Sequence, residues 1–248
     1  MSITSGSPRA DEVAATNITF YSDIWSGARL HRPDRFNTWP LVEKLAAAAP
    51  ARLEIGPGKR PRLPIAGTCF VDLNETAAGA LAAAGGYAGS ARLTQLPFGS
   101  DSFDLVAAID IIEHVPDDTL ALAEITRVLR PGGVLLLAVP LHPSRWTDFD
   151  AMVGHYRRYR PADLTALLAT HGYRVERSGL YGMQPKNTAL VRFGMHCIRR
   201  RRRVAMAVYN WLIMPLAALF QKPLEVQQGL IDTTGVDEII LVCRKRAQ

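Results

Sequence analysis

Two carboxylates and a glycine turn are the groups in this sequence whose spacing most clearly suggests a ligand. Glu54 leads into Gly56-Pro57-Gly58, and Asp72 ends the next apolar run, eighteen positions after Glu54. Glycines let a ligand approach the backbone closely, and a carboxylate can accept the hydrogens of both ribose hydroxyls. The spacing therefore indicates a nucleoside-bearing ligand, and the alternative is a tight turn without one.

The residues after this turn argue against a dinucleotide. A dinucleotide fingerprint has a third glycine that opens a helix, so that the helix amides receive the pyrophosphate. Here Arg60 and Pro61 stand at that point, and Pro64 follows. A proline costs about 3 kcal/mol in a helix interior. We therefore expect a short, irregular crossover from Lys59 to Thr68 and a nucleoside without phosphates.

The elements that would position these groups are short apolar runs that alternate with helix-like stretches, which is typical of βαβ units and a mainly parallel sheet. Asp117 and Asp118 can begin a helix that Pro131-Gly132-Gly133 ends, and a shorter helix starts near Pro161. Ligands of such sheets bind outside the carboxyl ends of the strands. The runs expected to be strands are 52–55, 68–71, 103–112, 134–139, 173–178 and 238–243.

Composition limits the class of protein. With 248 residues, 48% hydrophobic and 21% charged, the chain can form one large domain, or one with an appendage, and disorder is excluded. Three separated cysteines predict neither a disulfide framework nor a metal site, and the polar Met1–Asp11 lacks a secretion signal, so we expect a cytoplasmic protein. Five of the positive charges behind the net +6 lie in Arg199–Arg203, and no nucleic-acid partner is expected.

Five motifs in chain order resemble the class I S-adenosylmethionine-dependent methyltransferases, particularly the branch with the ubiquinone and menaquinone biosynthesis enzymes. The motifs are Leu53–Gly58, Val71–Leu73, Leu96–Val106, Ile111–Val115 and Glu124–Leu137. The resemblance covers Leu53 to Tyr173 and the last strand. It implies a doubly wound, Rossmann-like α/β fold with a mostly parallel seven-stranded sheet and an antiparallel last strand. It also implies an enzyme that uses S-adenosylmethionine.

The resemblance also implies which residues bind the cofactor. Those residues are Glu54, Gly56 and Gly58 against methionine and ribose, Asp72 on the ribose hydroxyls, Leu73 on the adenine, and Asp110 and Ile111 near the sulfonium. The family often has an acid before its Leu-Pro-Phe that contacts the adenine amino group. This sequence has Arg92-Leu93-Thr94-Gln95 there, so adenine contacts are expected from Leu93 and Thr94 instead.

Glu113 and His114 follow the fourth of the strands that the resemblance implies, and two interpretations are open. The resemblance suggests a divalent cation, as for some quinone O-methyltransferases, and imidazole with carboxylate suits one. The favoured interpretation is that the pair shapes the strand-to-helix loop, because two adjacent residues do not make a metal site. No metal is assigned.

The loop from Trp146 to Tyr159 follows the fifth strand and is expected over the acceptor. His155 is the candidate base, because histidine titrates near neutral pH. Candidate acceptor contacts are Trp146, Asp150, Tyr156 and Arg158, with Arg158 on an acidic group. In the alternative, Asp148 or Asp150 pairs with Arg157 or Arg158 and fixes the loop as a lid.

Four segments are expected: an aromatic cap (1–48), the cofactor-binding core (49–182), a basic and apolar helical insertion (183–230) and the final strand (231–248). In the insertion, Arg199–Arg203 precedes Val204–Phe220, whose helix would reach about 26 Å, slightly under a bilayer core. A full crossing would separate the final strand from its sheet. We therefore expect contact with a membrane surface through 199–220, and the alternative is a homodimer interface or an acceptor lid.

The leading hypothesis is a methyltransferase that acts on a small-molecule or lipid-linked acceptor, in the cytoplasm or at the inner face of the membrane. One alternative is an RNA methyltransferase guided by the arginine run. Another is a non-catalytic scaffold that keeps the fold.

Overall fold

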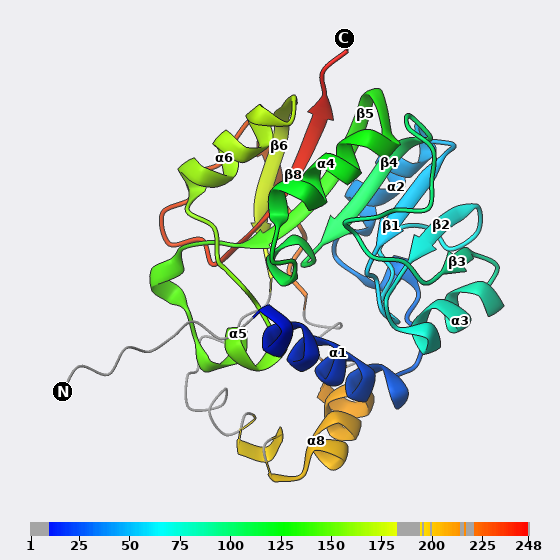
Figure 1. Cartoon of the computed structure of the whole chain (residues 1–248), viewed down its shortest axis with the longest axis vertical. Helices are drawn as coiled ribbons and strands as arrows, with labels where there is room; N and C mark the ends of the chain where they lie inside the picture. The colour runs from blue at the N-terminus through cyan, green and yellow to red at the C-terminus, as the bar shows by residue number, and fades with distance from the viewer. Residues whose placement is uncertain are drawn as a thin grey trace.

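The computed structural model describes residues 10–182, 194, 196–198, 200–213, 216 and 221–247. The described strands form one sheet in the order β3-β2-β1-β4-β5-β8-β6-β7 (Figure 1). Their bounds are β1 Arg52–Ile55, β2 Thr68–Val71, β3 Tyr87–Gly89, β4 Phe103–Ile109, β5 Leu129–Pro140, β6 Tyr173–Tyr181, β7 Val226–Gln228 and β8 Glu238–Lys245. The described helices are α1 Ala10–Ser26, α2 Trp39–Ala47, α3 Glu75–Ala83, α4 Asp118–Val128, α5 Asp148–Val153, α6 Pro161–Thr170 and α8 Arg202–Val208.

The direction of the strands agrees with the prediction, but their number does not. Strands β3, β2, β1, β4 and β5 are parallel neighbours, and β8 is antiparallel to both β5 and β6. Seven strands were expected, and the described sheet has eight, because β7 pairs antiparallel with β6 at Arg177–Gly179. This strand lies inside 183–230, the range predicted to be a helical insertion. Three residues are too few for an alternating pattern, so tertiary pairing rather than local sequence defines β7.

The crossover between β1 and β2 is irregular, as predicted from its prolines, and contains no helix. In place of helical carbonyls, the Glu54 carboxylate accepts backbone hydrogen bonds of this crossover. It accepts the backbone N–H of Arg62 at 2.8 Å and that of Leu63 at 2.8 Å. A buried carboxylate therefore satisfies amide donors that a regular helix would pair internally.

Both faces of the sheet are buried, which explains the continuous apolar run of β5. Leu135 and Leu137 pack with α4 and α6 on one face, and Leu136 packs with α2 on the other. Successive side chains of a strand alternate between faces, so a strand covered on both sides must be apolar at every position.

The helix expected from Asp117 is α4, and its first turn is capped as predicted. The Asp117 side chain accepts the Leu120 N–H at 2.9 Å. The helix ends at Val128, three residues before Pro131, because the chain enters β5 at Leu129, where Leu129 pairs with Phe103.

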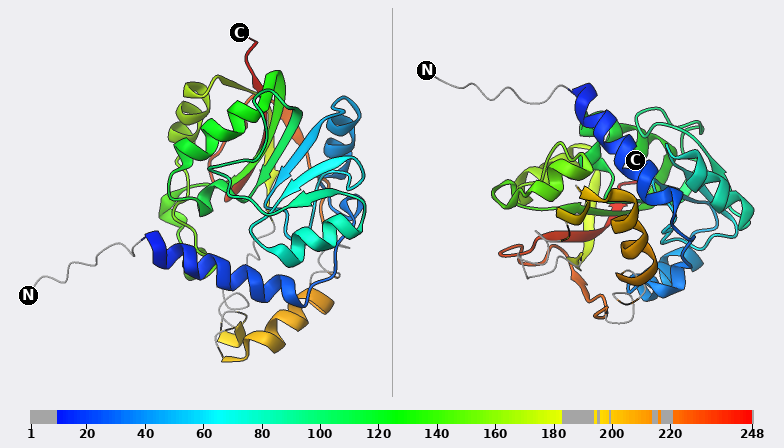
Figure 2. Two further views of the ribbon diagram at one scale, coloured as in Figure 1. Left: turned by 45° about the vertical axis from the view of Figure 1, so that its right-hand side comes forward. Right: turned by 90° about the horizontal axis from the view of Figure 1, so that it is seen from below.

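Helices α1 and α8 lie beyond the carboxyl ends of the parallel strands (Figures 1 and 2). Phe20, Ile24 and Trp25 of α1 form a small core with Val153 of α5, and Tyr209 packs against it. Tyr209 begins a π-helical turn, η4 Tyr209–Ile213, that continues α8. The N-terminal helix is thus held by α5 on one side and by the segment around α8 on the other.

Only part of the predicted apolar segment Val204–Phe220 is described, namely α8, η4 and Leu216. Arg199 and Pro215 lie outside the described residues, and so does the kink that a proline at 215 would give to such a helix. Among the helices that the structure describes, none is long and apolar enough to cross a membrane.

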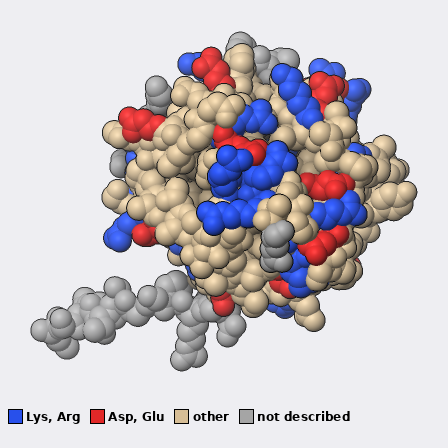
Figure 3. All heavy atoms as spheres, turned by 90° about the horizontal axis from the view of Figure 1, so that it is seen from above, with Lys and Arg blue, Asp and Glu red and all other residues tan. Residues whose placement is uncertain are grey.

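The opposite face of the molecule, at the amino ends of the parallel strands, carries a mixture of basic and acidic side chains (Figure 3). Two of the arginines near the amino ends of β4 and β5 and on β8 are ion-paired. Arg130 lies 2.6 Å from Asp104, and Arg244 lies 3.0 Å from Glu176. These pairs partly neutralise the positive charge on that side of the sheet.

Candidate functional site

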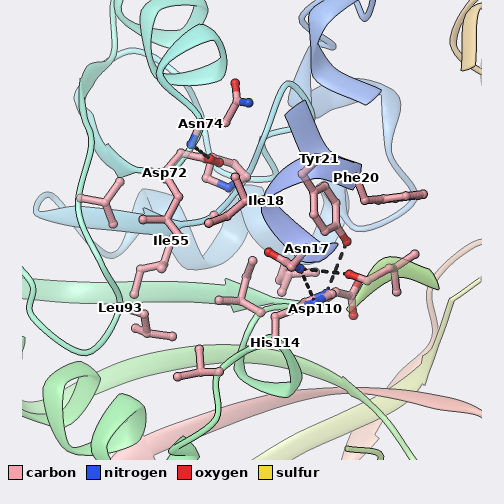
Figure 4. A pocket seen from close by; sticks show the side chains of 18 of the residues that line it. Asn17, Ile18, Phe20, Tyr21, Ile55, Asp72, Asn74, Leu93, Asp110 and His114 are labelled. Carbon is pink, nitrogen blue, oxygen red and sulfur yellow. Dashed lines mark hydrogen bonds between the residues drawn. The ribbon is translucent and has the colours of Figure 1, made fainter. Parts of the chain in front are cut away.

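A cavity of about 620 Å³ lies at the carboxyl ends of β1, β2 and β4, beneath α1 (Figure 4). The strand order reverses between β1 and β4, which is where ligands of doubly wound sheets bind. The cavity wall includes these cofactor-binding residues expected from the sequence: Glu54, Gly56, Asp72, Leu73, Leu93, Thr94, Asp110 and Ile111. Gly58, also in the predicted set, does not line the wall, but its backbone N–H is bonded to Asp72.

Asp72 is fixed from behind by two backbone amides. Its Oδ2 accepts the Gly58 N–H at 2.8 Å, and its Oδ1 accepts the Asn74 N–H at 2.8 Å. Burial raises the pKa of this carboxyl group, and the two amides oppose the shift. Each oxygen keeps a lone pair for a further donor. The carboxylate is therefore suited to the two hydroxyls of a ribose.

The glycine turn fits its surroundings only without side chains. Gly56 has φ +64° and Gly58 φ +56°. A Cβ on Gly56 would lie 2.2 Å from the Ile111 Cδ1, and one on Gly58 would lie 2.2 Å from the Trp25 ring. Because Trp25 belongs to α1, the N-terminal helix is packed directly onto the turn.

Acidic side chains gather where β4 ends. Asp110 has φ +55°, and its buried Oδ1 has no hydrogen-bond partner. Neither carboxylate oxygen of the fully buried Glu113 has one. Burial and the neighbouring Asp110 raise the pKa of both Glu113 and Glu238 well above the ordinary value. A cationic ligand beside Asp110 would favour the ionised form of these carboxyl groups.

His114 lies in the cavity wall, although the sequence suggested only a loop-shaping or metal-binding role for it. Asn17 Nδ2 lies 2.7 Å from its Nδ1, and the Tyr21 hydroxyl lies 3.3 Å from its Nε2 (Figure 4). Burial and the nearby His155 ring lower the pKa of His114 to about 3. The imidazole is therefore neutral at physiological pH. Asn17 and Tyr21 both belong to α1; Tyr21 falls within the predicted aromatic cap, whereas Asn17 had no signal in the sequence.

His155, the predicted base, lies behind His114, with the two ring centroids 4.5 Å apart. Its Nδ1 lies 2.9 Å from Asp150 Oδ1. His155 is not part of the cavity wall, so the histidine that directly faces a ligand is His114. A catalytic role for His155 stays a prediction.

The predicted acceptor contacts are not part of the cavity wall either. Asp150 and Arg158 form a buried ion pair at 2.9 Å, and Arg158 also reaches Asp237 at 3.0 Å. This is the lid-fixing pair that the sequence offered as the alternative. Trp146 is exposed, and the Tyr156 backbone N–H donates to the Glu113 carbonyl. Acceptor binding by the four predicted residues, Trp146, Asp150, Tyr156 and Arg158, remains a prediction.

Glu113, His114 and His155 are the described residues that could hold a metal ion. Each offers one ligand atom, and these atoms lie within 4.8 Å of one another. Carboxylate with two imidazoles suits several divalent metals. No metal is predicted from the sequence, and the geometry of these three side chains leaves that prediction untested.

Comparison with known proteins identifies the core. Residues 55–137 match a family model described as a methyltransferase domain. A probable S-adenosylmethionine-dependent methyltransferase of Mycolicibacterium smegmatis is 40% identical over 89 residues, which cover 34% of this chain and 34% of that protein. A demethylmenaquinone methyltransferase of Mycobacterium tuberculosis is 36% identical over 104 residues, covering 36% of this chain and 44% of that protein. Residues 55–137 of this chain match a methyltransferase domain and resemble S-adenosylmethionine-dependent enzymes.

The predicted resemblance and its methyl donor, S-adenosylmethionine, are thereby confirmed for this domain. A solved S-adenosylmethionine-dependent methyltransferase from Thermotoga maritima, described as a possible histamine N-methyltransferase, shares the fold. Its TM-score is 0.52 at 15% identity, over 79% of this chain and 82% of that one. The chain aligns with about a third of the first curated relative and less than half of the second.

The glycine turn yields a prediction about cofactor affinity. Gly56→Ala should weaken binding of S-adenosylhomocysteine at least tenfold in calorimetry, because the new Cβ displaces Ile111 into the cavity. The matched control is Gly132→Ala, at φ +74° with nothing within 4 Å of the new Cβ. The control bears similar backbone strain and should bind normally. Equal affinity of the two variants would contradict the prediction.

Glu54 yields a prediction about the pH dependence of stability. Burial raises its pKa from 4.5 to about 7, so folding favours the protonated form. Its stabilising contribution is complete below pH 4.5 and is lost as the pH rises to about 7. The loss amounts to about 3 kcal/mol at 1.36 kcal/mol per pKa unit.

Chemical unfolding between pH 4 and 8 measures this effect. The free energy of unfolding of Glu54→Gln should rise relative to that of the wild type between pH 4.5 and 7. Glu43→Gln, at an exposed position of α2, is the control and should follow the wild type throughout. A constant difference between Glu54→Gln and wild type across the range would refute the prediction.

Proposed function

We propose that this protein transfers the methyl group of S-adenosylmethionine to a small-molecule or lipid-linked acceptor. The observation that carries the proposal is the Asp72 carboxylate, which two amides aim at a cavity beside the glycine turn. The methyltransferase domain match supports the donor. One relative is named for methylation of demethylmenaquinone, which supports a small lipid-like acceptor.

For methyl transfer the protein must align the two reactants and exclude water, because the sulfonium of the bound cofactor is itself the electrophile. Apolar side chains supply the dry wall. Phe20, Ile24 and Trp25 of α1 and Phe149 and Val153 of α5 line the cavity on the side away from the sheet. An acceptor held between this wall and Asp110 would lie near the position proposed for the sulfonium.

His114 is the group that we propose to orient a polar acceptor atom. A neutral imidazole both donates and accepts hydrogen bonds. Asn17 and the Gly154 carbonyl lie 2.7 and 3.1 Å from its Nδ1, and the Tyr21 hydroxyl lies 3.3 Å from its Nε2, so these partners fix the orientation of the ring. His155, paired with Asp150 behind His114, stays the proposed base.

The test of the donor and the reaction uses labelled S-adenosylmethionine with separated lipid and aqueous extracts. The wild type should move label into one extract, and Asp72→Ala should abolish both labelling and S-adenosylhomocysteine binding. Asp163→Ala, at an exposed position of α6, is the control and should behave as the wild type.

Three outcomes of this experiment would count against the proposal. A wild type that does not bind S-adenosylhomocysteine removes the donor. Binding without label in either extract supports the scaffold alternative. Label that appears in added RNA supports the RNA alternative.

We further propose that α8 and η4 contact the membrane surface from the cytoplasmic side. Val204, Trp211 and Leu212 expose their side chains, and Arg200 and Arg201 beside them are also exposed. An amphipathic helix binds a bilayer surface through apolar contact and attraction to anionic lipid. Tyr209 of the same segment lines the cavity, so a lipid-linked acceptor could pass from the surface to the site. The described cysteines are all free thiols, which agrees with the cytoplasm.

Sedimentation with vesicles tests this contact. The wild type should bind vesicles that contain anionic phosphatidylglycerol and release at high salt, and Leu212→Gln should weaken binding several-fold. The matched control is Leu180→Gln on β6, since Leu180 is 62% exposed and Leu212 56%. A wild type that stays in the supernatant, or equal loss in both variants, contradicts the proposal.

A further inference from the structure

Two arginines, Arg60 and Arg62, also lie in the cavity wall, apart from the predicted cofactor-binding residues. Both come from the irregular crossover between β1 and β2. In an extended segment, residues two apart point to the same side, whereas a helix would separate them. The prolines that prevent the helix therefore allow both side chains to reach one cavity.

The guanidinium of Arg62 is surrounded by neutral partners. Its Nη2 donates to the Tyr181 hydroxyl at 3.1 Å, and its Nη1 donates to the Arg60 carbonyl at 2.7 Å. The Phe36 ring centroid lies 3.8 Å from its Cζ. Its buried Nε has no hydrogen-bond partner.

Arg60 has a similar environment on the side of α8. Its Nη2 donates to Asn210 Oδ1 at 3.1 Å, and its Nη1 lies 3.5 Å from the Tyr209 hydroxyl. The ring of Trp25 is 5.1 Å from its Cζ. Its Nε is also buried without a partner.

Within the described part of the chain, no carboxylate lies within 4.0 Å of either guanidinium. Glu54 and Asp110 act on Arg62 only from farther away. The Glu54 carboxylate is already committed to the amides of Arg62 and Leu63. A buried charge without a partner is costly, and arginine stays protonated in proteins.

We propose that Arg60 and Arg62 form an anion subsite, which binds a carboxylate or phosphate group of a ligand in the cavity. Arginine donors match the oxygens of both groups. The inference rests on the proposed function and extends it to the charge of the ligand. Two sources of the anion fit the position. One is the methionine carboxylate of the cofactor, since the arginines directly follow the glycine turn. The other is an acidic group on the acceptor, since Arg60 contacts η4.

Calorimetry with two nucleosides distinguishes the sources. S-adenosylhomocysteine has the carboxylate, and 5′-methylthioadenosine has the same nucleoside without the amino-acid group. The test variant is the double substitution Arg60→Gln and Arg62→Gln, which removes both charges but keeps amide donors. Arg160→Gln, at an exposed position before α6, is the matched control. Inorganic phosphate, titrated alone and into the enzyme saturated with S-adenosylhomocysteine, is the third probe.

Two results would support the subsite. If the cofactor supplies the anion, the double variant loses at least tenfold in S-adenosylhomocysteine affinity and keeps its affinity for 5′-methylthioadenosine. If the acceptor supplies it, both nucleosides bind the variant normally, and phosphate binds the saturated wild type but not the saturated variant. Arg160→Gln matches the wild type in either case.

Two results would overturn the subsite. The first is that the double variant binds both nucleosides and phosphate with the same affinity as the wild type. The second is an equal loss of affinity for both nucleosides without any change for phosphate, which indicates a structural effect.

Should the double variant fail to fold, it is replaced by Arg60→Lys and Arg62→Lys, which keep the charge but lose the planar fork. They should then show the same selective loss in weaker form, and equal affinities would refute the subsite. A wild type that binds neither nucleoside refutes the proposed function instead, and phosphate titrated alone still tests the arginines.

Discussion

The hydrogen bond from the Gly58 amide to the Asp72 carboxylate is the contact on which the site depends. It joins the turn after β1 to the end of β2, and the Asn74 amide holds the second carboxylate oxygen. A carboxylate fixed at both oxygens cannot rotate away, so it presents its remaining lone pairs in one direction. The backbone conformation at Gly58 that aims the amide requires φ +56°, where a side chain would also strike Trp25. The glycine turn, Asp72 and α1 are therefore held together by direct contacts, and a change in one would displace the others.

The same crossover determines the electrostatics of the cavity. Without a helix after β1, the amides of Arg62 and Leu63 turn to Glu54, and two arginine side chains reach the cavity wall. Asp110 also lies in the cavity wall and keeps one carboxylate oxygen without a hydrogen-bond partner. The cavity wall thus carries both basic and acidic side chains. Such a wall is suited to a zwitterionic ligand that carries both a sulfonium and a carboxylate.

Sequence reasoning located the groups that stand close together along the chain and missed those brought together by folding. Glu54, Gly56 and Asp72 follow buried strands, and the carboxyl ends of parallel strands must meet at one edge, so their convergence was predictable. The irregular crossover was predictable as well, because the effect of proline is local. Tyr21 and His114 are 93 positions apart, and no periodicity reports on such a contact. For β7, three residues without an apolar pattern became a strand only because β6 offered an open edge.

The choice between His114 and His155 shows a second limit of sequence reasoning. The aromatic and charged loop around His155 suggested a base there, whereas His114, which comes soon after a strand, was expected to shape the strand-to-helix loop. The fold places them differently: Asp150 pairs with Arg158 and holds His155 behind the cavity, whereas His114 lies in the cavity wall. A catalytic role for either histidine stays a prediction.

A crystal structure with S-adenosylhomocysteine tests the central claim most directly. The account predicts the two ribose hydroxyls within 3.2 Å of the Asp72 oxygens, with the Gly58 and Asn74 amides still bonded to the same carboxylate. A nucleoside bound elsewhere, or an Asp72 side chain turned away from the ribose, would contradict it.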